Sequence, residues 1–234
     1  MLLLHGVGNS GAIFRPILPT LAESGPVAAP TMSPELLSGG AIDPLVDWLA
    51  QVYPPPWRLV GHSMGGLLIG LILRTRPDVV AGSLLINAPL PGVVRRINSG
   101  DTLDRTGRAV LAMKALARVT SIGRPHVPKF LRGAELAIVR NALRGFVYEP
   151  FALDADVIGR AIVASRTSDG VDFLELAHDL PDVEGEPFTG CPVSILLGDS
   201  DPLVPMSDHD AIAARYPDRP VILNLPATVE VAMP

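Results

Sequence analysis

The chain has 234 residues, of which 48% are hydrophobic and 18% charged, and its net charge is −5. This composition suffices for one domain with a large apolar core, and the absence of a basic cluster argues against a nucleic-acid partner. The single cysteine, Cys191, excludes an intrachain disulfide and a cysteine metal cluster and fits a reducing cytoplasm. No apolar run reaches the roughly 18 residues of a membrane span, and residues 1–4 are too few for a secretory signal.

The first part of the chain alternates between predicted strands and predicted helices. Short apolar runs bounded by glycine and proline predict strands at 2–4, 27–29, 57–60 and 79–87. Apolar residues at helical spacing predict helices at 13–21, 42–52 and 67–73, with Ile42, Leu45, Val46 and Leu49 on one face of the second. The continuous apolar character of the strands is typical of a parallel sheet that is buried on both faces.

The alternation stops after Asn87. Residues 95–187 contain several helical patches broken by prolines and no convincing strand. The sheet pattern then resumes with strands at 192–197 and 221–225 and a helix at 207–216. We therefore predict an α/β fold with a doubly wound, mostly parallel sheet of about six strands. Its core consists of residues 1–91 and 188–234, and residues 92–187 form an inserted helical cap.

The chain is organised around Gly61-His62-Ser63-Met64-Gly65, which fits the Gly-x-Ser-x-Gly pattern of a nucleophile elbow. A predicted strand enters the motif and a predicted helix leaves it. So sharp a turn strains the backbone of Ser63 and exposes its hydroxyl, while the flanking glycines let neighbouring backbone pass close by. The Met64 N–H, at the start of the helix, points to where an oxyanion would form. The alternative is a strand-to-helix turn whose serine is idle.

Three motifs in order resemble the α/β-hydrolase superfamily. They are most similar to its lidded branch of small esterases, thioesterase-like enzymes, haloperoxidase-like enzymes and C–C hydrolases. Residues 2–6 resemble the family's third strand and its His-Gly loop, residues 61–66 its commonest elbow, and residues 198–205 the turn that carries the acid. Together these motifs span nearly the whole chain, which makes the combination more specific than any one of them.

The resemblance implies a role for each matching residue. Ser63 would be the nucleophile and Asp201 the acid, with Asp199 as a less favoured substitute. The backbone N–H groups of Val7 and Met64 would form the oxyanion hole. Asp201 also has a purely structural alternative, as the residue that forms the turn before Pro202.

His5, Gly6 and His62 are expected to border the substrate site. For His5 we favour a structural role, in which the ring braces its loop through bonds to the backbone. His62 is expected to pack beside the elbow. A Gly6-Val7-Gly8 loop can also suggest a dinucleotide site, but the acidic residue required about twenty positions later is absent. We therefore expect no cofactor, and the spacing of His and Asp residues suggests no metal site.

The chain departs from the superfamily at the histidine, which normally follows the last strand. Here Glu230 takes the closest position, and no histidine occurs after His209. A carboxylate with a reference pKa of about 4.3 is a weaker base than an imidazole at about 6.5, so we expect Ser63 to be activated poorly. His126 or His178, both in the predicted cap, are alternative bases.

Three functions therefore stay open. The first is an esterase-like or thioesterase-like serine hydrolase with a weakened triad, acting on a small to medium apolar acyl substrate. The second is a non-hydrolytic biosynthetic enzyme that uses the oxyanion pocket for an elimination, cyclisation or rearrangement. The third is a non-catalytic protein that binds a ligand, because the fold alone does not fix the function. In each case the small molecule would lie at the carboxyl ends of the strands, beneath the cap.

Overall fold

A computed structural model describes residues 1–6, 9–33, 35–37, 41–88, 190–198, 201, 204 and 223–225. The cap predicted at 92–187 and the helix predicted at 207–216 lie outside the described residues, as do Val7, Asp199 and Glu230. The division of the chain into a core and a cap therefore stays a prediction.

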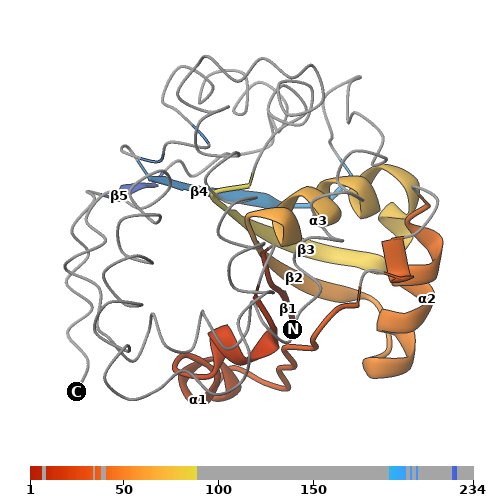
Figure 1. Ribbon diagram of the computed structural model, residues 1–234, viewed down its shortest axis with the longest axis horizontal. Coiled ribbons are helices and arrows are strands. Elements are labelled where there is room, and N and C mark those ends of the chain that lie inside the picture. The colour runs from red at the N-terminus through yellow and green to blue at the C-terminus, as the bar shows by residue number, and fades with distance from the viewer. Residues whose placement is uncertain are drawn as a thin grey trace, which may run out of the picture.

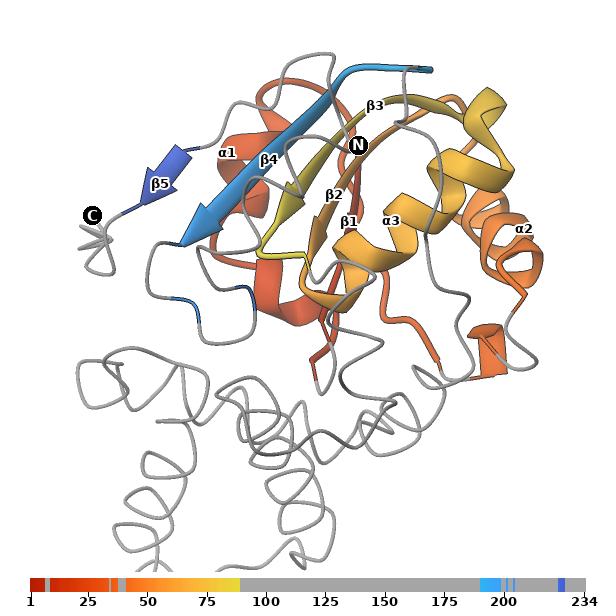
Figure 2. The ribbon, with the colours of Figure 1, turned by 90° about the horizontal axis from the view of Figure 1, so that it is seen from above.

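The described strands form one five-stranded sheet in the order β1-β2-β3-β4-β5, with every neighbouring pair parallel. The strands are β1 (Leu2–Leu4), β2 (Trp57–His62), β3 (Val80–Ile86), β4 (Val193–Gly198) and β5 (Leu223–Leu225). Figure 2 shows their arrowheads pointing the same way, so their carboxyl ends share one edge of the sheet. The predicted parallel α/β sheet is confirmed.

The sixth strand, expected at 27–29, does not form as a full strand. Only one of its residues pairs with β1. Ala28 forms an isolated parallel bridge with Leu2. The Leu3 N–H donates to the Ala28 carbonyl at 2.9 Å, and the Ala28 N–H donates to the Met1 carbonyl at 3.0 Å. Pro30 follows closely and has no N–H to extend the ladder, which accounts for the short pairing.

Helices cover both faces of the sheet. Figure 2 shows α2 (Asp43–Val52) and α3 (Met64–Thr75) on one face and α1 (Leu18–Ala22) on the other, and Figure 1 shows α3 lying along the strands. In α3, every residue from Met64 to Leu73 is buried, as expected of an apolar helix enclosed on all sides. In α2 only Leu45, Val46 and Leu49 are buried, which confirms the face predicted from their spacing.

The single helix predicted over 13–21 is wrong. A 3-10 turn, η1 (Gly11–Phe14), comes first, and α1 follows as a separate helix. Pro16 and Pro19 lie within this stretch, and a proline inside a helix removes a hydrogen bond and clashes with the preceding turn. Ile13 and Ile17 are 44% and 47% exposed, so their helical spacing does not mark a face of the core.

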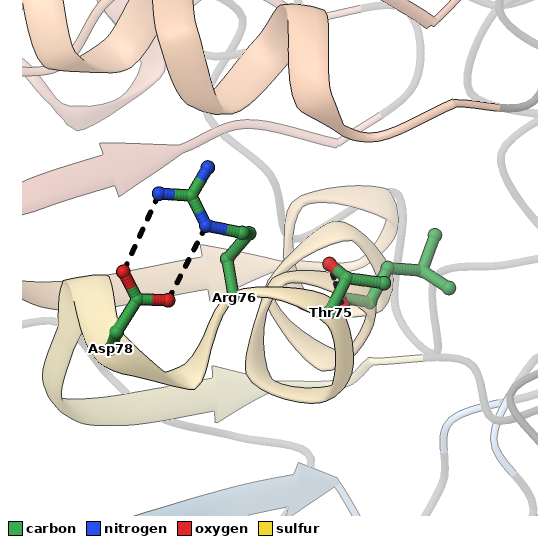
Figure 3. A network of polar contacts seen from close by, with 4 residues as sticks. Thr75, Arg76 and Asp78 are labelled. Atoms are coloured by element: carbon green, nitrogen blue, oxygen red, sulfur yellow. Dashed lines mark hydrogen bonds and ion pairs between the residues drawn. The ribbon is translucent and has the colours of Figure 1, made fainter.

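The link between α3 and β3 is held by local polar contacts (Figure 3). The Thr75 hydroxyl donates to the Leu71 carbonyl at 3.0 Å, and Arg76 donates from Nε and Nη2 to the Asp78 carboxylate at 3.3 and 3.4 Å. Pro77 begins the 3-10 turn η3 (Pro77–Val79), which directs the chain into β3. Because both charged groups are exposed to solvent, the ion pair contributes little stability and serves to fix the turn.

Candidate active site

Ser63 occupies a strained turn between β2 and α3. Its backbone angles are φ 53° and ψ −120°, a combination that a non-glycine residue rarely adopts. Three bonds hold this conformation: the Ser63 N–H donates to the Ile86 carbonyl at 2.9 Å, and the Ser63 carbonyl accepts from the N–H groups of Gly66 and Leu67 at 2.9 and 3.2 Å. Although Ser63 is the N-cap of α3, its side chain makes no capping bond. The hydroxyl is therefore not committed to the helix.

The glycines of the elbow are required by backbone packing. A Cβ on Gly61 would lie 2.5 Å from the Gly65 carbonyl group and from the Gly66 nitrogen. A Cβ on Gly65 would overlap the Leu4 carbonyl group of β1, and one on Gly66 would lie 2.5 Å from the Ala88 Cβ. The first turn of α3 is thus packed directly against the backbone of β1 and β2.

The same packing brings the His5-Gly6 loop beside the nucleophile. A Cβ on Gly6 would lie 3.1 Å from the Ser63 Cβ and 3.3 Å from His62 Nδ1. Two motifs separated by more than fifty positions in the sequence therefore meet at one point. Met64 is the first residue of α3, so its N–H is one of the helix N–H groups that have no acceptor within the helix.

His5 is fully buried, and both of its ring nitrogens are occupied. The Met32 N–H donates to His5 Nε2 at 3.0 Å. Since Nε2 accepts, Nδ1 carries the proton and donates to the Gly6 carbonyl at 2.9 Å. Burial lowers the pKa of His5, and the bond to Gly6 opposes this only in part, so the ring is neutral at pH 7. These bonds support the bracing role expected for His5.

His62 ends β2 immediately before the nucleophile. Its Nδ1 atom is buried and, within the part of the chain that the structure describes, has no hydrogen-bond partner. Burial lowers the pKa of the His62 ring, which favours the neutral form. The geometry agrees with the predicted packing position beside the elbow, where Nδ1 faces Gly6.

Asp201 lies in a tight turn just after β4. Its N–H donates to the Gly198 carbonyl at 3.4 Å, and its Oδ1 accepts from the Val204 N–H at 3.1 Å. This side-chain-to-backbone bond is the turn-forming role that the sequence left open for this residue. In the sheet order, β3 lies between β2 and β4. Ser63 and Asp201 are therefore at the same edge of the sheet, with β3 between them.

The sequence analysis missed Asn87, which follows β3 and lies between these two positions. Its φ is 43°, and its Oδ1 accepts from the Gly198 N–H at 2.8 Å. An asparagine directly after an apolar strand was the available signal, because asparagine tolerates the left-handed region better than most residues.

A family profile described as "Alpha/beta hydrolase family" matches residues 1–230. The chain belongs to this family. Solved structures of similar fold include an esterase from Thermogutta terrifontis, with 17% identity and a TM-score of 0.64 over 97% of this chain and 80% of that one. A Bacillus megaterium epoxide hydrolase has 21% identity and a TM-score of 0.65 over 98% and 85% of the two chains. No curated protein matches the sequence.

The described part of this α/β hydrolase brings together most of the residues expected at its site, namely His5, Gly6, His62, Ser63 and Met64. Asp201 lies at the same edge of the sheet, with β3 between it and Ser63. Val7 and Glu230 lie outside the described residues. Within the described ranges, no three His, Cys, Asp or Glu side chains are grouped so that they could hold a metal ion. No helix there is long and apolar enough to cross a membrane.

Proposed function

We propose that this α/β hydrolase is a serine hydrolase that cleaves an ester or thioester of a small to medium apolar acyl group. The strained backbone of Ser63 carries the proposal, because such strain persists only where the surroundings over-determine it and clusters at catalytic positions. An idle serine in a simple turn needs neither this conformation nor a hydroxyl that leaves the helix uncapped.

In the proposed reaction, Ser63 Oγ attacks the acyl carbon and loses its proton to a base. The negative charge that develops on the carbonyl oxygen is stabilised by the backbone N–H groups of Met64 and Val7. The alcohol or thiol then leaves with a proton, and water hydrolyses the acyl–Ser63 ester to release the acid. His5 does not take the proton in this scheme, because both of its ring nitrogens are bonded to the backbone.

The base is the least usual part of the proposal. Glu230 is the candidate by sequence register, and Asp201 would be the acid. A carboxylate base is protonated only at low pH and accepts a proton weakly, so turnover should be slow. A triad that lacks one member retains about 10³–10⁴-fold catalysis over water through the oxyanion hole and substrate binding. The apolar acyl group is inferred from the leucine, isoleucine, valine and alanine content of the predicted cap.

The test is intact-mass spectrometry after exposure to a fluorophosphonate, with Ser63→Ala as the control. The expected result is one adduct on the wild type and none on the variant. Labelling that slows in Glu230→Gln, and not in His126→Ala or His178→Ala, would identify Glu230 as the base. A folded wild type that gains no adduct would overturn the proposal. Non-hydrolytic chemistry or ligand binding at the same position would then be the functions to test.

A further inference from the structure

β3 ends between Ser63 and the turn after β4 that holds Asp201, which we call the acid turn. Backbone groups at this end of β3 bond to both sides. On one side, the Ile86 carbonyl accepts from the Ser63 N–H at 2.9 Å. On the other side, the next residue, Asn87, donates its N–H to the Leu196 carbonyl of β4 at 2.8 Å. The last residue of β3 and the residue after it therefore bond to the two neighbouring strands, which lead to Ser63 and Asp201.

The Asn87 side chain replaces a backbone group of the sheet. β3 and β4 pair in register up to Ile86 and Leu196. In a regular parallel ladder the next bond would run from the Gly198 N–H to the Asn87 carbonyl. At Asn87, however, the backbone turns into the left-handed region with φ 43°, and the Gly198 N–H donates instead to Asn87 Oδ1 at 2.8 Å. The ladder thus gains one further bond after the strand itself has ended.

This extra bond falls on the residue that anchors the acid turn. The Gly198 carbonyl accepts from the Asp201 N–H at 3.4 Å, and Asp201 Oδ1 accepts from the Val204 N–H at 3.1 Å. A Cβ on Gly198 would lie 3.6 Å from Asn87 Nδ2 and 3.8 Å from the Asp201 Cβ, so both side chains border the same side of Gly198.

We propose that Asn87 is a positioning residue: its side-chain oxygen holds the Gly198–Asp201 turn at a fixed place relative to Ser63. The structural part of this inference does not depend on activity. Its catalytic consequence rests on the proposed function, in which Asp201 orients the base. Small displacements of a catalytic group are costly, so a residue that touches neither substrate nor base can still set the rate.

The structural part is tested by amide hydrogen exchange at Val204, measured by NMR. Asn87→Gly accepts the positive φ and removes the oxygen, whereas Asn87→Asp accepts the same φ and keeps it. We expect Asn87→Gly to raise the exchange rate of the Gly198 and Val204 amides about 3- to 10-fold, and Asn87→Asp to preserve the wild-type protection. Unchanged protection of Val204 in Asn87→Gly, or equal loss in both variants, would overturn the inference.

The catalytic part is tested by the kinetics of fluorophosphonate labelling. We expect Asn87→Gly to lower the maximal labelling rate constant about 3- to 10-fold while the half-saturating concentration and the final labelled fraction stay unchanged. A merely destabilised protein would instead lose labelled fraction, and that result, like a wild-type rate constant, would count against positioning. A wild type that does not label refutes the proposed function, and the exchange at Val204 then decides the inference alone.

Discussion

Gly65 has no room for a side chain, because the Leu4 carbonyl group lies where its Cβ would be. Leu4 directly precedes the His5-Gly6 loop. The close contact between Gly65 and Leu4 therefore also fixes the distance between this loop and the elbow at Ser63. Gly82, in β3, offers a useful contrast. The nearest atom to a Cβ there would be the Pro192 carbonyl oxygen at 3.5 Å, an ordinary van der Waals contact.

We therefore expect Gly65→Ala to lower the free energy of unfolding by about 1–3 kcal/mol, because two backbone segments must move apart. Labelling of Ser63 by a fluorophosphonate should slow in the same variant. Gly82→Ala, the matched control, should retain or slightly raise the stability, since alanine loses less chain entropy on folding than glycine. Urea unfolding of the two variants checks this. Equal stabilities would show that the first turn of α3 yields more easily than its contacts suggest.

At the scale of whole elements, the sequence predicted what depends on neighbours along the chain. The apolar spacing of α2 and the glycine pattern before α3 are local signals, and both elements formed as expected. The spacing of Ile13 and Ile17 led to the wrong prediction of one helix over 13–21, because prolines within that stretch prevent a continuous helix. Asn87 was missed for a different reason. Its partner, Gly198, is 111 positions away, and only the register of β3 against β4 brings the two together.

Mutations on α2 can test directly the difference between the buried and the exposed face of an amphipathic helix. Leu49 is 0% exposed and Val52 is 40% exposed, three positions apart on the same helix. Leu49→Ala should lower the free energy of unfolding by about 2–5 kcal/mol, because it leaves a cavity in the apolar core. Val52→Ala should change it by less than about 0.5 kcal/mol, as is usual for exposed positions. Thermal or urea unfolding that gave similar losses for both would contradict the burial of this face.

At the scale of the whole molecule, the buried His5 and the half-buried His62 link the cooperative unfolding of the protein to pH. Burial lowers the pKa of both His5 and His62 from the usual value of 6.5. Below that value the unfolded chain binds more protons than the folded one, so the free energy of unfolding falls as the pH falls. Well above it, both histidines are almost wholly unprotonated in either state, and their contribution is fully present.

We expect the free energy of unfolding to be lower at pH 5.5 than at pH 7.5, with a slope of at most about 1.4 kcal/mol per pH unit for each histidine. His5→Gln, which offers an acceptor oxygen to the Met32 N–H, should flatten this dependence and leave the part due to His62. Urea denaturation at the two pH values measures it. A variant with the full wild-type slope would show that His5 does not contribute.

At Gly61 and Gly65, the first turn of α3 meets β2 and β1 through peptide groups, with no side chain between them. Peptide groups are the same in every sequence, so these two contacts do not depend on which apolar residues fill the core. Exchanges such as leucine for isoleucine elsewhere should alter how tightly the helices pack and keep both contacts. The sequence can therefore change at many positions while the backbone around Ser63 keeps its geometry, provided that these few positions remain glycine.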